Sequence, residues 1–309
     1  MITTVTLNPA IDKTMTFDHF EPGEINRASA VREDMGGKGI NVAKLLSHLD
    51  IPITAIGFIG SQNANYVHTL LKDSVFKKDF VAINALTRTN IKLVDLSKSE
   101  TTDINDPGFM VSENDIQILF DKLALYAEQS DYLILSGSAP TGTPKTLYRD
   151  MIRQFNEYTR IVVDAEGELL VQALEASPFL IKPNLHELEN ALGKPLKTDA
   201  EIIEECKRLI ERYRLTYILV SMGGDGSLLV SADEAWKALP IRVPVKSTVG
   251  AGDSMVAGFI YGLVSFDDPS KALAYGAACG ALAVGKSGTE AFEKSESDAF
   301  LDRIQIVHL

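Results

Sequence analysis

Short apolar runs rich in Val, Ile and Leu alternate with longer amphipathic segments along most of the chain. The runs typical of buried strands are ITTVTL (2–7), ITAIGF (53–58), YLILSG (132–137), RIVVDA (160–165), FLIKPN (179–184) and YILVSMG (217–223). The segments with helical periodicity are 39–49, 115–129, 143–155, 199–213 and two closing helices near 251–264 and 270–284. This alternation predicts an α/β domain with a mostly parallel sheet between two helical layers.

Two stretches break this alternation, residues 13–35 and 86–111. Both contain strands and turns without an intervening helix, and side chains alternate along NIKLVDL (90–96), which suits a small sheet with one exposed face. They form either a lid over a site or a plain extension of the sheet edge. The predicted division is a lid of 13–35 and 86–111, and a main domain of 1–12, 36–85 and 112–309.

Composition narrows the function classes. At 309 residues and 45% hydrophobic, the chain can bury a large core. A net charge of −12, without a basic stripe interleaved with aromatics, disfavours nucleic-acid partners. The two cysteines and five histidines form no metal-ligand spacing. Neither a leader nor a membrane-spanning run is evident, so we expect a cytoplasmic protein without a membrane partner.

The most informative string is STVGAGDSMVAGFIYGL (247–263), in which a glycine-rich turn leads into a helix. The free amides of Gly250, Ala251 and Gly252, with the helix dipole behind them, suit anionic oxygens. Asp253 stands at this opening. It is either an N-cap, for which aspartate is a preferred residue, or a catalytic base.

A second glycine-rich turn opens a helix in MGGKGINVAKLL (35–46). Gly36 and Gly37 let the backbone approach a ligand, Lys38 supplies a charge, and Asn41 supplies a hydrogen bond. The spacing is not that of a Walker loop. A tight strand-to-helix turn with a solvated lysine explains the string equally well.

A third string, LIKPNLHELENAL (180–192), ends a buried strand with Lys182. Asn184 and Glu187 follow three residues apart, on one helix face, where they could hold hydrated Mg²⁺ beside a nucleotide. The same pair also fits a capping box, with Asn184 as N-cap and Glu187 at the third helical position.

Weaker signals lie elsewhere. Asp12 follows the first strand, where open α/β sheets bind ligands, but aspartate is also an ordinary turn residue. Arg27 and Arg88 fall in the two lid-like segments, where surface arginines are common. The glycines of SMGGDG (221–226) border a nucleotide or turn a hairpin.

In this order, TLNPAID, GGKGINVA, TRTN, SGSAP, IKPN and TVGAGDSMVAG closely resemble segments of the ribokinase-like sugar kinases of the phosphofructokinase B family, nearly from end to end. The resemblance implies a three-layer ribokinase-like fold, with a mostly parallel sheet, helices on both faces and a small β-sheet lid. Such a lid commonly joins two subunits, so a homodimer is expected.

The resemblance also implies site residues. Asp253 is the base and Gly250, Ala251 and Gly252 form the anion hole. ATP binds Lys182, Asn184, Ser221, Gly223, Gly226 and Thr248, and Glu187 with Asn184 holds Mg²⁺ through water. The sugar phosphate binds Asp12, Gly36, Gly37, Lys38, Asn41, Arg88 and Arg27. Three residues depart from the family pattern: Ala139 in SGSAP, and Ala165 and Glu166 in DAEGE (164–168).

The implied reaction is transfer of the γ-phosphoryl of ATP to a primary hydroxyl of a ketohexose phosphate. TLNPAIDKT, EINRAS and GFIGSQN are closer to members that phosphorylate fructose 1-phosphate at C6 than to those that act on tagatose 6-phosphate. An ordinary aspartate pKa near ~3.9 suffices for a base that takes its proton late. A non-catalytic sensor of ATP or sugar phosphate is the alternative, although it would be expected to lose the base or the metal glutamate.

Overall fold

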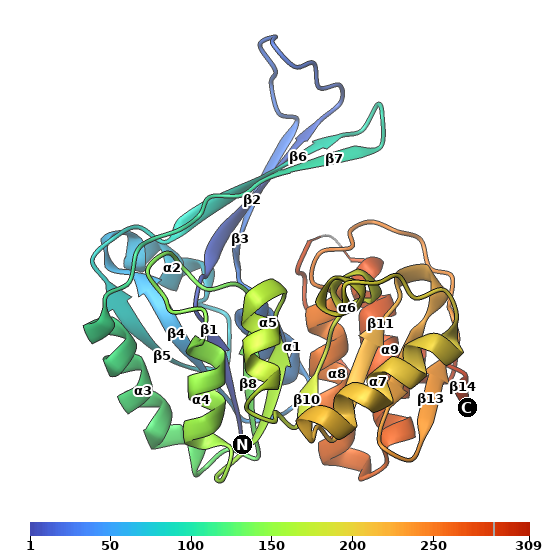
Figure 1. The fold of residues 1–309 in the computed structure, drawn as a ribbon. Helices are drawn as coiled ribbons and strands as arrows, with labels where there is room; N and C mark the ends of the chain where they lie inside the picture. Colours follow the sequence, from blue (N-terminus) through green and yellow to red (C-terminus); the bar gives the residue numbers. More distant parts are fainter. Residues whose placement is uncertain (287) are drawn as a thin grey trace.

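The computed structural model describes residues 1–286 and 288–309, and these form a large sheet between two layers of helices (Figure 1). From one edge to the other, the strands of this sheet are β14 (Ile306–His308), β13 (Ala235–Ala238), β12 (Ser227–Val230), β11 (Tyr217–Ser221), β10 (Leu180–Ile181), β9 (Arg160–Asp164), β8 (Tyr132–Ser136), β1 (Ile2–Thr6), β4 (Ile53–Gly60) and β5 (Lys77–Ile83). Neighbours from β11 to β5 are parallel, and β11 to β14 are antiparallel.

Helices cover both faces of this sheet, because most of its strands are apolar on both sides. One face packs against α3 (Glu113–Ala127), α4 (Leu147–Phe155), α5 (Gly167–Leu174), α6 (Leu185–Leu192) and α7 (Asp199–Tyr213). The other packs against α1 (Lys38–His48), α2 (Ala64–Leu70), α8 (Ala251–Phe266), α9 (Pro269–Val284) and α10 (Lys294–Leu301). Two separate hydrophobic cores result, one on each side of the sheet.

Local capping fixes where several helices begin. Ser112 accepts a hydrogen bond from the backbone of Asp115 and so caps α3 with a reciprocal capping box. Asp268 caps α9, whose first residue is Pro269, a position where the missing N–H of proline costs nothing. These signals are readable in the sequence, and they explain why the predicted helix bounds fall within a few residues of the observed ones.

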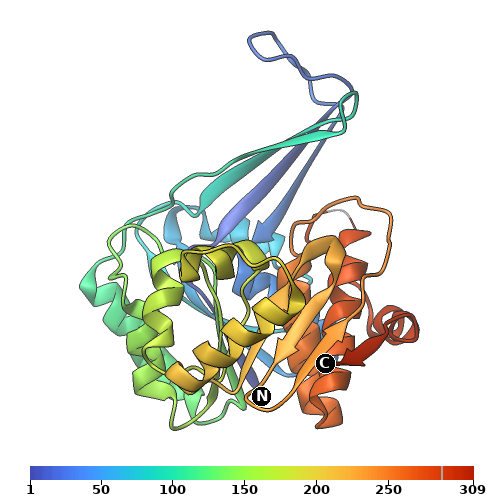
Figure 2. The ribbon, with the colours of Figure 1, turned by 45° about the vertical axis from the view of Figure 1, so that its right-hand side comes forward.

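A second, four-stranded sheet stands away from the main body (Figures 1 and 2). Its strands are β3 (Ala30–Gly36), β2 (Ala10–Phe17), β6 (Arg88–Asp95) and β7 (Glu100–Ile104), in that order. The chain enters it directly after β1 and leaves it from β3 into α1, so this sheet overhangs the carboxyl ends of the main strands. We call it the small sheet.

The predicted fold class is confirmed: the main sheet is mostly parallel, helices cover both faces, and the small sheet is present. The helix expected at 199–213 is α7, and the two closing helices are α8 and α9. The sequence did not indicate α10 or β14. The exact division into a lid of 13–35 and 86–111 and a main domain stays a prediction, although β2 begins earlier, at Ala10.

Among the helices of the described residues, none combines the length and apolar character needed to cross a bilayer.

Candidate active site

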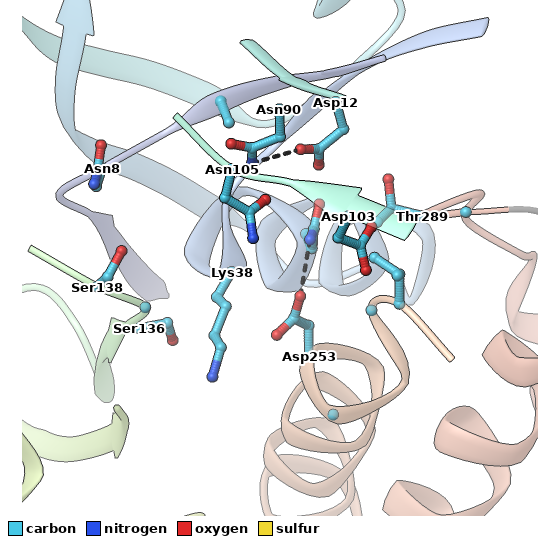
Figure 3. Close-up of a pocket in the computed structure, with 18 of the residues that line it drawn as sticks. Asn8, Asp12, Lys38, Asn90, Asp103, Asn105, Ser136, Ser138, Asp253 and Thr289 are labelled. Carbon is cyan, nitrogen blue, oxygen red and sulfur yellow. Dashed lines mark hydrogen bonds between the residues drawn. The ribbon is translucent and has the colours of Figure 1, made fainter. Parts of the chain in front are cut away.

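A cavity of about 500 Å³ opens where the small sheet overhangs the main sheet, and its lining is rich in polar side chains (Figure 3). The carboxyl ends of β1, β8 and β9 reach it, as expected for ligand sites of open parallel sheets. The predicted residues that line it are Asp12, Gly37, Lys38, Asn41, Arg88, Lys182, Asn184, Glu187, Ser221, Gly250, Gly252 and Asp253. Segments from the whole length of the chain therefore meet at one site.

A second cavity, of about 640 Å³, adjoins the first and is more apolar. The two share Asn184, Ser221 and Gly252. Gly223, Gly226, Thr248 and Ala251 also line the second cavity, together with side chains such as Val243, Val245 and Met255. A polar compartment beside an apolar one suits a ligand with a charged end and a flat apolar end.

The SMGGDG segment both turns a hairpin and borders the apolar cavity. Its glycines form a short 3-10 turn between the antiparallel strands β11 and β12. Gly226 is confined to glycine, because its φ is 92° and a Cβ there would lie 2.2 Å from the Ala238 carbonyl oxygen. Both interpretations of this segment from the sequence are thus compatible with its geometry.

Asp253 is not an N-cap. The N-cap of α8 is Gly250, which adopts the left-handed conformation with φ 77°, and Asp253 lies at the third helical position. Its carboxylate is buried and accepts a hydrogen bond of 2.8 Å from Nδ2 of Asn41 on α1 (Figure 3). The capping interpretation is therefore wrong, because the side chain turns inward to another helix.

Burial raises the pKa of Asp253 to about 6, and the charge of Asp164 adds to this rise. Lys38, Asn41 and Lys182 oppose it. From the sequence, an ordinary aspartate pKa was expected to suffice for Asp253 as the base. Since a general base works best with a pKa near the working pH, the higher value favours proton acceptance from a hydroxyl.

Asp164 is a central residue that the sequence analysis did not name. It ends β9, is fully buried, and its Oδ1 lies 3.1 Å from Lys38 Nζ and 3.3 Å from Lys182 Nζ. Although burial raises the pKa of this carboxyl, the two ammonium groups more than offset it and hold the pKa below its usual value. Its position at the carboxyl end of a parallel strand is the signal that could have identified it.

The two lysines converge on the same oxygen of this carboxylate. Lys182 follows β10 and is almost fully buried, and its Nζ would be 3.5 Å from a Cβ on Gly252, at the start of α8. Lys38 is partly open to the cavity and extends away from Asp12, toward the level of Asp253 (Figure 3). Asp164, Asp253 and Glu187 all raise the pKa of Lys38 above its usual value.

Asn184 and Glu187 form a reciprocal capping box at the start of α6. Asn184 Oδ1 accepts from the Glu187 amide at 2.8 Å, and Glu187 Oε2 accepts from the Asn184 amide at 2.8 Å. The other carboxylate oxygen of Glu187 accepts no hydrogen bond from a described residue. Because Asn184 and Glu187 line the cavity as well, the capping box does not exclude a metal role.

The donor set fits hydrated Mg²⁺ better than a directly bound metal. No group of three or more His, Cys, Asp and Glu side chains within residues 1–286 and 288–309 could hold an ion by itself. Glu187 offers one free oxygen, and Asp164 Oδ2 is buried without a hydrogen-bond partner among described atoms. Magnesium commonly keeps several waters and takes one or two carboxylates together with substrate phosphates.

Asp12 lies in the small sheet on β2, not at the end of β1 as its place in the sequence suggested. Its Oδ1 accepts a hydrogen bond of 3.0 Å from Asn90 on β6, and burial raises its pKa. Gly36 does not line the cavity but leaves room for this carboxylate, since a Cβ there would be 1.9 Å from Asp12 Oδ2.

Arg88 and Arg27 occupy different environments. Arg88 lines the polar cavity and donates to the backbone oxygens of Asn8 and Asp106. Arg27 is exposed and does not line the cavity; it belongs to the loop between β2 and β3, which lies at the far end of the small sheet (Figure 2). Its substrate role stays a prediction.

Several cavity-lining residues were not named from the sequence: Asn8, Arg32, Asp34, Asn90, Lys92, Asp103, Asn105, Ser136, Ser138 and Thr289. Asn90 and Lys92 share one face of β6 with Arg88, so a strict alternation from Arg88 could have indicated both. Of the departures, Ala139 and Ala165 pack against the core, whereas Glu166 lines the cavity.

Comparison with known proteins agrees with this geometry. The family model described as pfkB family carbohydrate kinase matches residues 5–296. The chain is 40% identical over 266 residues to a 1-phosphofructokinase of Xanthomonas campestris pv. campestris, covering 84% of this chain and 83% of that protein. It is 35% identical over 306 residues to the 1-phosphofructokinase of Escherichia coli K12, covering 99% and 97%.

A solved structure of Escherichia coli phosphofructokinase-2 in complex with substrates and products superposes with a TM-score of 0.92 at 27% identity, covering 98% of each chain. Two adjoining cavities, a buried aspartate at a helix start and this fold are all consistent with a sugar kinase. The chain belongs to the pfkB family of carbohydrate kinases. It is an ATP-dependent phosphotransferase.

Proposed function

We propose that the protein transfers the γ-phosphoryl group of ATP to the C6 hydroxyl of D-fructose 1-phosphate, giving fructose 1,6-bisphosphate and ADP. The observation that carries the chemistry is the buried Asp253 carboxylate, held by Asn41 at the opening of α8. The substrate assignment is supported by the curated relatives of this chain, which are 1-phosphofructokinases of Xanthomonas campestris pv. campestris and Escherichia coli.

Asp253 acts as the base. Its carboxylate orients the C6 hydroxyl and accepts the proton as the new P–O bond forms. The pKa near 6 leaves it ionised at neutral pH, ready to accept. The adjoining Gly250, Ala251 and Gly252 amides, at the positive end of the α8 dipole, stabilise the negative charge of the transferring oxygens.

Lys182 and Lys38 stabilise the same charge with their ammonium groups. Both ammonium groups contact Asp164, within reach of the start of α8. The resemblance assigned Lys38 to the phosphate already on the sugar. In Figure 3 its side chain extends away from Asp12, and its ammonium group contacts Asp164 and interacts electrostatically with Asp253, which instead favours contact with the transferring phosphoryl group. Arg88 is then the cation available to the existing phosphate.

ATP binds with its phosphates in the polar cavity and its base in the apolar one. Ser221, Gly223, Gly226 and Thr248 border the nucleotide. Glu187 and Asn184 would hold Mg²⁺ through water, and the bound ion would supply positive charge to the phosphate oxygens. On the sugar side, Asp12 accepts hydrogen bonds from ring hydroxyls, with Asn90 orienting its carboxylate.

The small sheet joins two subunits in a homodimer. On its face opposite the cavity, Val31, Met15 and Leu93 lie in one row across three strands, and Val31 is 54% exposed. An exposed apolar strip on a thin sheet is costly unless it is covered. A second copy of the chain covers it, and Arg27 lies on the loop beside this face. A cytoplasmic location stays a prediction.

The test is ADP release in a coupled assay with MgATP, with and without fructose 1-phosphate. A kinase releases one ADP for each sugar bisphosphate that it forms. A non-catalytic sensor would bind both ligands and release none.

A further inference from the structure

The loop after α9 meets the small sheet at one glycine. A Cβ added to Gly288 would lie 2.0 Å from Arg32 Nη2 and 3.7 Å from Asp34 Oδ2. The backbone of Gly288 is also in the left-handed region, with φ 62°. The Arg32 guanidinium therefore rests directly on this loop, and a side chain at position 288 would displace it.

Charged neighbours fix the direction of Arg32. Its Nε lies 2.8 Å from Asp34 Oδ2, two residues along β3. Beneath Asp34, the ammonium group of Lys44 on α1 interacts electrostatically with it and donates to the Met35 carbonyl. Positive and negative side chains thus alternate from Lys44 on α1, through Asp34 on β3, to Arg32 at the loop. Since a partly exposed ion pair adds little stability, its effect is expected on the position of β3 relative to the loop.

The same loop contacts the start of α8. Thr289 follows Gly288, and its Cγ2 would lie 3.2 Å from a Cβ on Gly250. Gly250 is the N-cap of α8. Arg32, Gly288 and Thr289 all line the polar cavity. A continuous path of contacts therefore connects the small sheet to the helix start across the cavity mouth.

We propose that Arg32 is a positioning residue: its contact with Gly288 holds the small sheet, which carries Asp12, at a fixed distance from the α8 start, which carries Asp253. This rests on the proposed function, since Asp12 and Asp253 are assigned to opposite sides of the sugar. The contact matters because a displacement of about 1 Å at a reacting centre can cost on the order of 10²-fold in rate.

The experiment compares four proteins: the wild type, Arg32→Ala, Gly288→Ala and the double variant. In Gly288→Ala the new methyl group overlaps the guanidinium, so kcat/KM for the sugar phosphate should fall on the order of tenfold or more, while the KM for ATP stays within about twofold. The double variant removes the overlap and should recover at least about threefold relative to Gly288→Ala. If the kcat/KM losses of the two single variants instead multiply in the double variant, without recovery, the proposal is overturned.

Gly193→Ala is the matched control for backbone strain. Gly193 has φ 68°, close to that of Gly288, but nothing lies within 4 Å of its missing Cβ. We expect it to keep kcat/KM within about twofold, because Gly193 lines neither cavity and the variant carries only the strain of a left-handed residue. If Gly288→Ala behaves like Gly193→Ala, the contact has no positioning role.

Hydrogen exchange separates this proposal from the proposed function. Peptides covering β3 and the loop 288–292 should exchange faster in Arg32→Ala and Gly288→Ala than in the wild type, and slower in the double variant than in Gly288→Ala. This readout does not depend on turnover. If hydrogen exchange is unchanged in both single variants, the positioning role of Arg32 is overturned, even if the protein is an active kinase. If the wild type shows no turnover, only the proposed function is overturned.

Discussion

Asn41 and Asp253 are 212 positions apart in the sequence, yet Asn41 Nδ2 donates to Asp253 Oδ2 at 2.8 Å. The two residues come from the first helix of the main domain and from α8, and each lies in the first turns of a helix that starts with glycine. Two glycine-rich turns therefore meet with their helix starts facing one cavity. Because the carboxylate is buried, its activity and its effect on stability should be linked.

Replacing Asp253 with Asn should lower kcat on the order of 10² or more, because positioned acid–base groups contribute about 10² to 10⁴. The same change should stabilise the fold at neutral pH. The folded-state pKa is above the usual 3.8, so the ionised carboxylate costs stability that grows from about pH 4 and is complete above about pH 6. The gain should be on the order of 2–3 kcal/mol at pH 8 and vanish near pH 4.

Thermal or denaturant unfolding at pH 8 and pH 4 checks this, alongside kcat. An Asn variant that keeps activity within a few-fold would remove Asp253 from the mechanism. One that is inactive but less stable than wild type at pH 8 would show that the carboxylate is a structural support.

The pH profile of kcat/KM should fall as pH drops below about 6, where Asp253 becomes protonated. The sugar phosphate also titrates near ~6, so the wild-type profile alone does not identify the group. Asn41→Ala provides the comparison. Asn41 stabilises the ionised carboxylate, so its loss should move the midpoint upward. An identical midpoint in both proteins would assign the titration to the substrate.

Asp164→Asn should have the opposite effect on stability from Asp253→Asn. Asp164 is the buried partner of two lysines and its pKa is lowered, so its stabilisation is present above pH 4 and lost as pH falls. Removing the charge leaves Lys182 buried without its counter-charge, at a cost of roughly 3–5 kcal/mol. Urea unfolding at pH 7 measures this, and a variant as stable as wild type would contradict the pairing.

Glu187→Gln tests the metal role separately from the cap. Glutamine retains a side-chain oxygen for the Asn184 amide, so the capping box and the thermal stability should be nearly unchanged. The Mg²⁺ concentration needed for half-maximal rate should rise several-fold, because a carboxylate binds hydrated magnesium better than an amide. Lower stability with an unchanged Mg²⁺ requirement would limit Glu187 to capping.

The parts of the site that follow directly from local sequence were predictable. This applies to Asp253, Lys182 and the glycines of the α8 turn. Each lies where a strand or turn leads into a helix, and this local pattern places them near a helix start. The choice between alternatives was not predictable. Whether Asp253 caps its own helix or faces Asn41 depends on how α1 and α8 pack, and no local pattern reports that packing.

Other residues depend on long-range pairing. Asp164 gains its importance only because β9 brings it between Lys38 and Lys182, which come from two other segments. Asp12 was expected at the end of β1, but the chain continues into β2 after a short turn, and the register with β6 sets its contact with Asn90. Register between distant strands is decided by tertiary packing.

Fructose 1-phosphate is the substrate proposed for this kinase. The most direct measurement is kcat/KM at saturating MgATP for fructose 1-phosphate, tagatose 6-phosphate and fructose 6-phosphate. A site that hydrogen-bonds a particular ring hydroxyl rejects an analogue lacking it strongly. We expect fructose 1-phosphate to be the best substrate by about tenfold or more. A tenfold preference for tagatose 6-phosphate would contradict the substrate assignment, and no turnover of any of the three would contradict the mechanism built on Asp253.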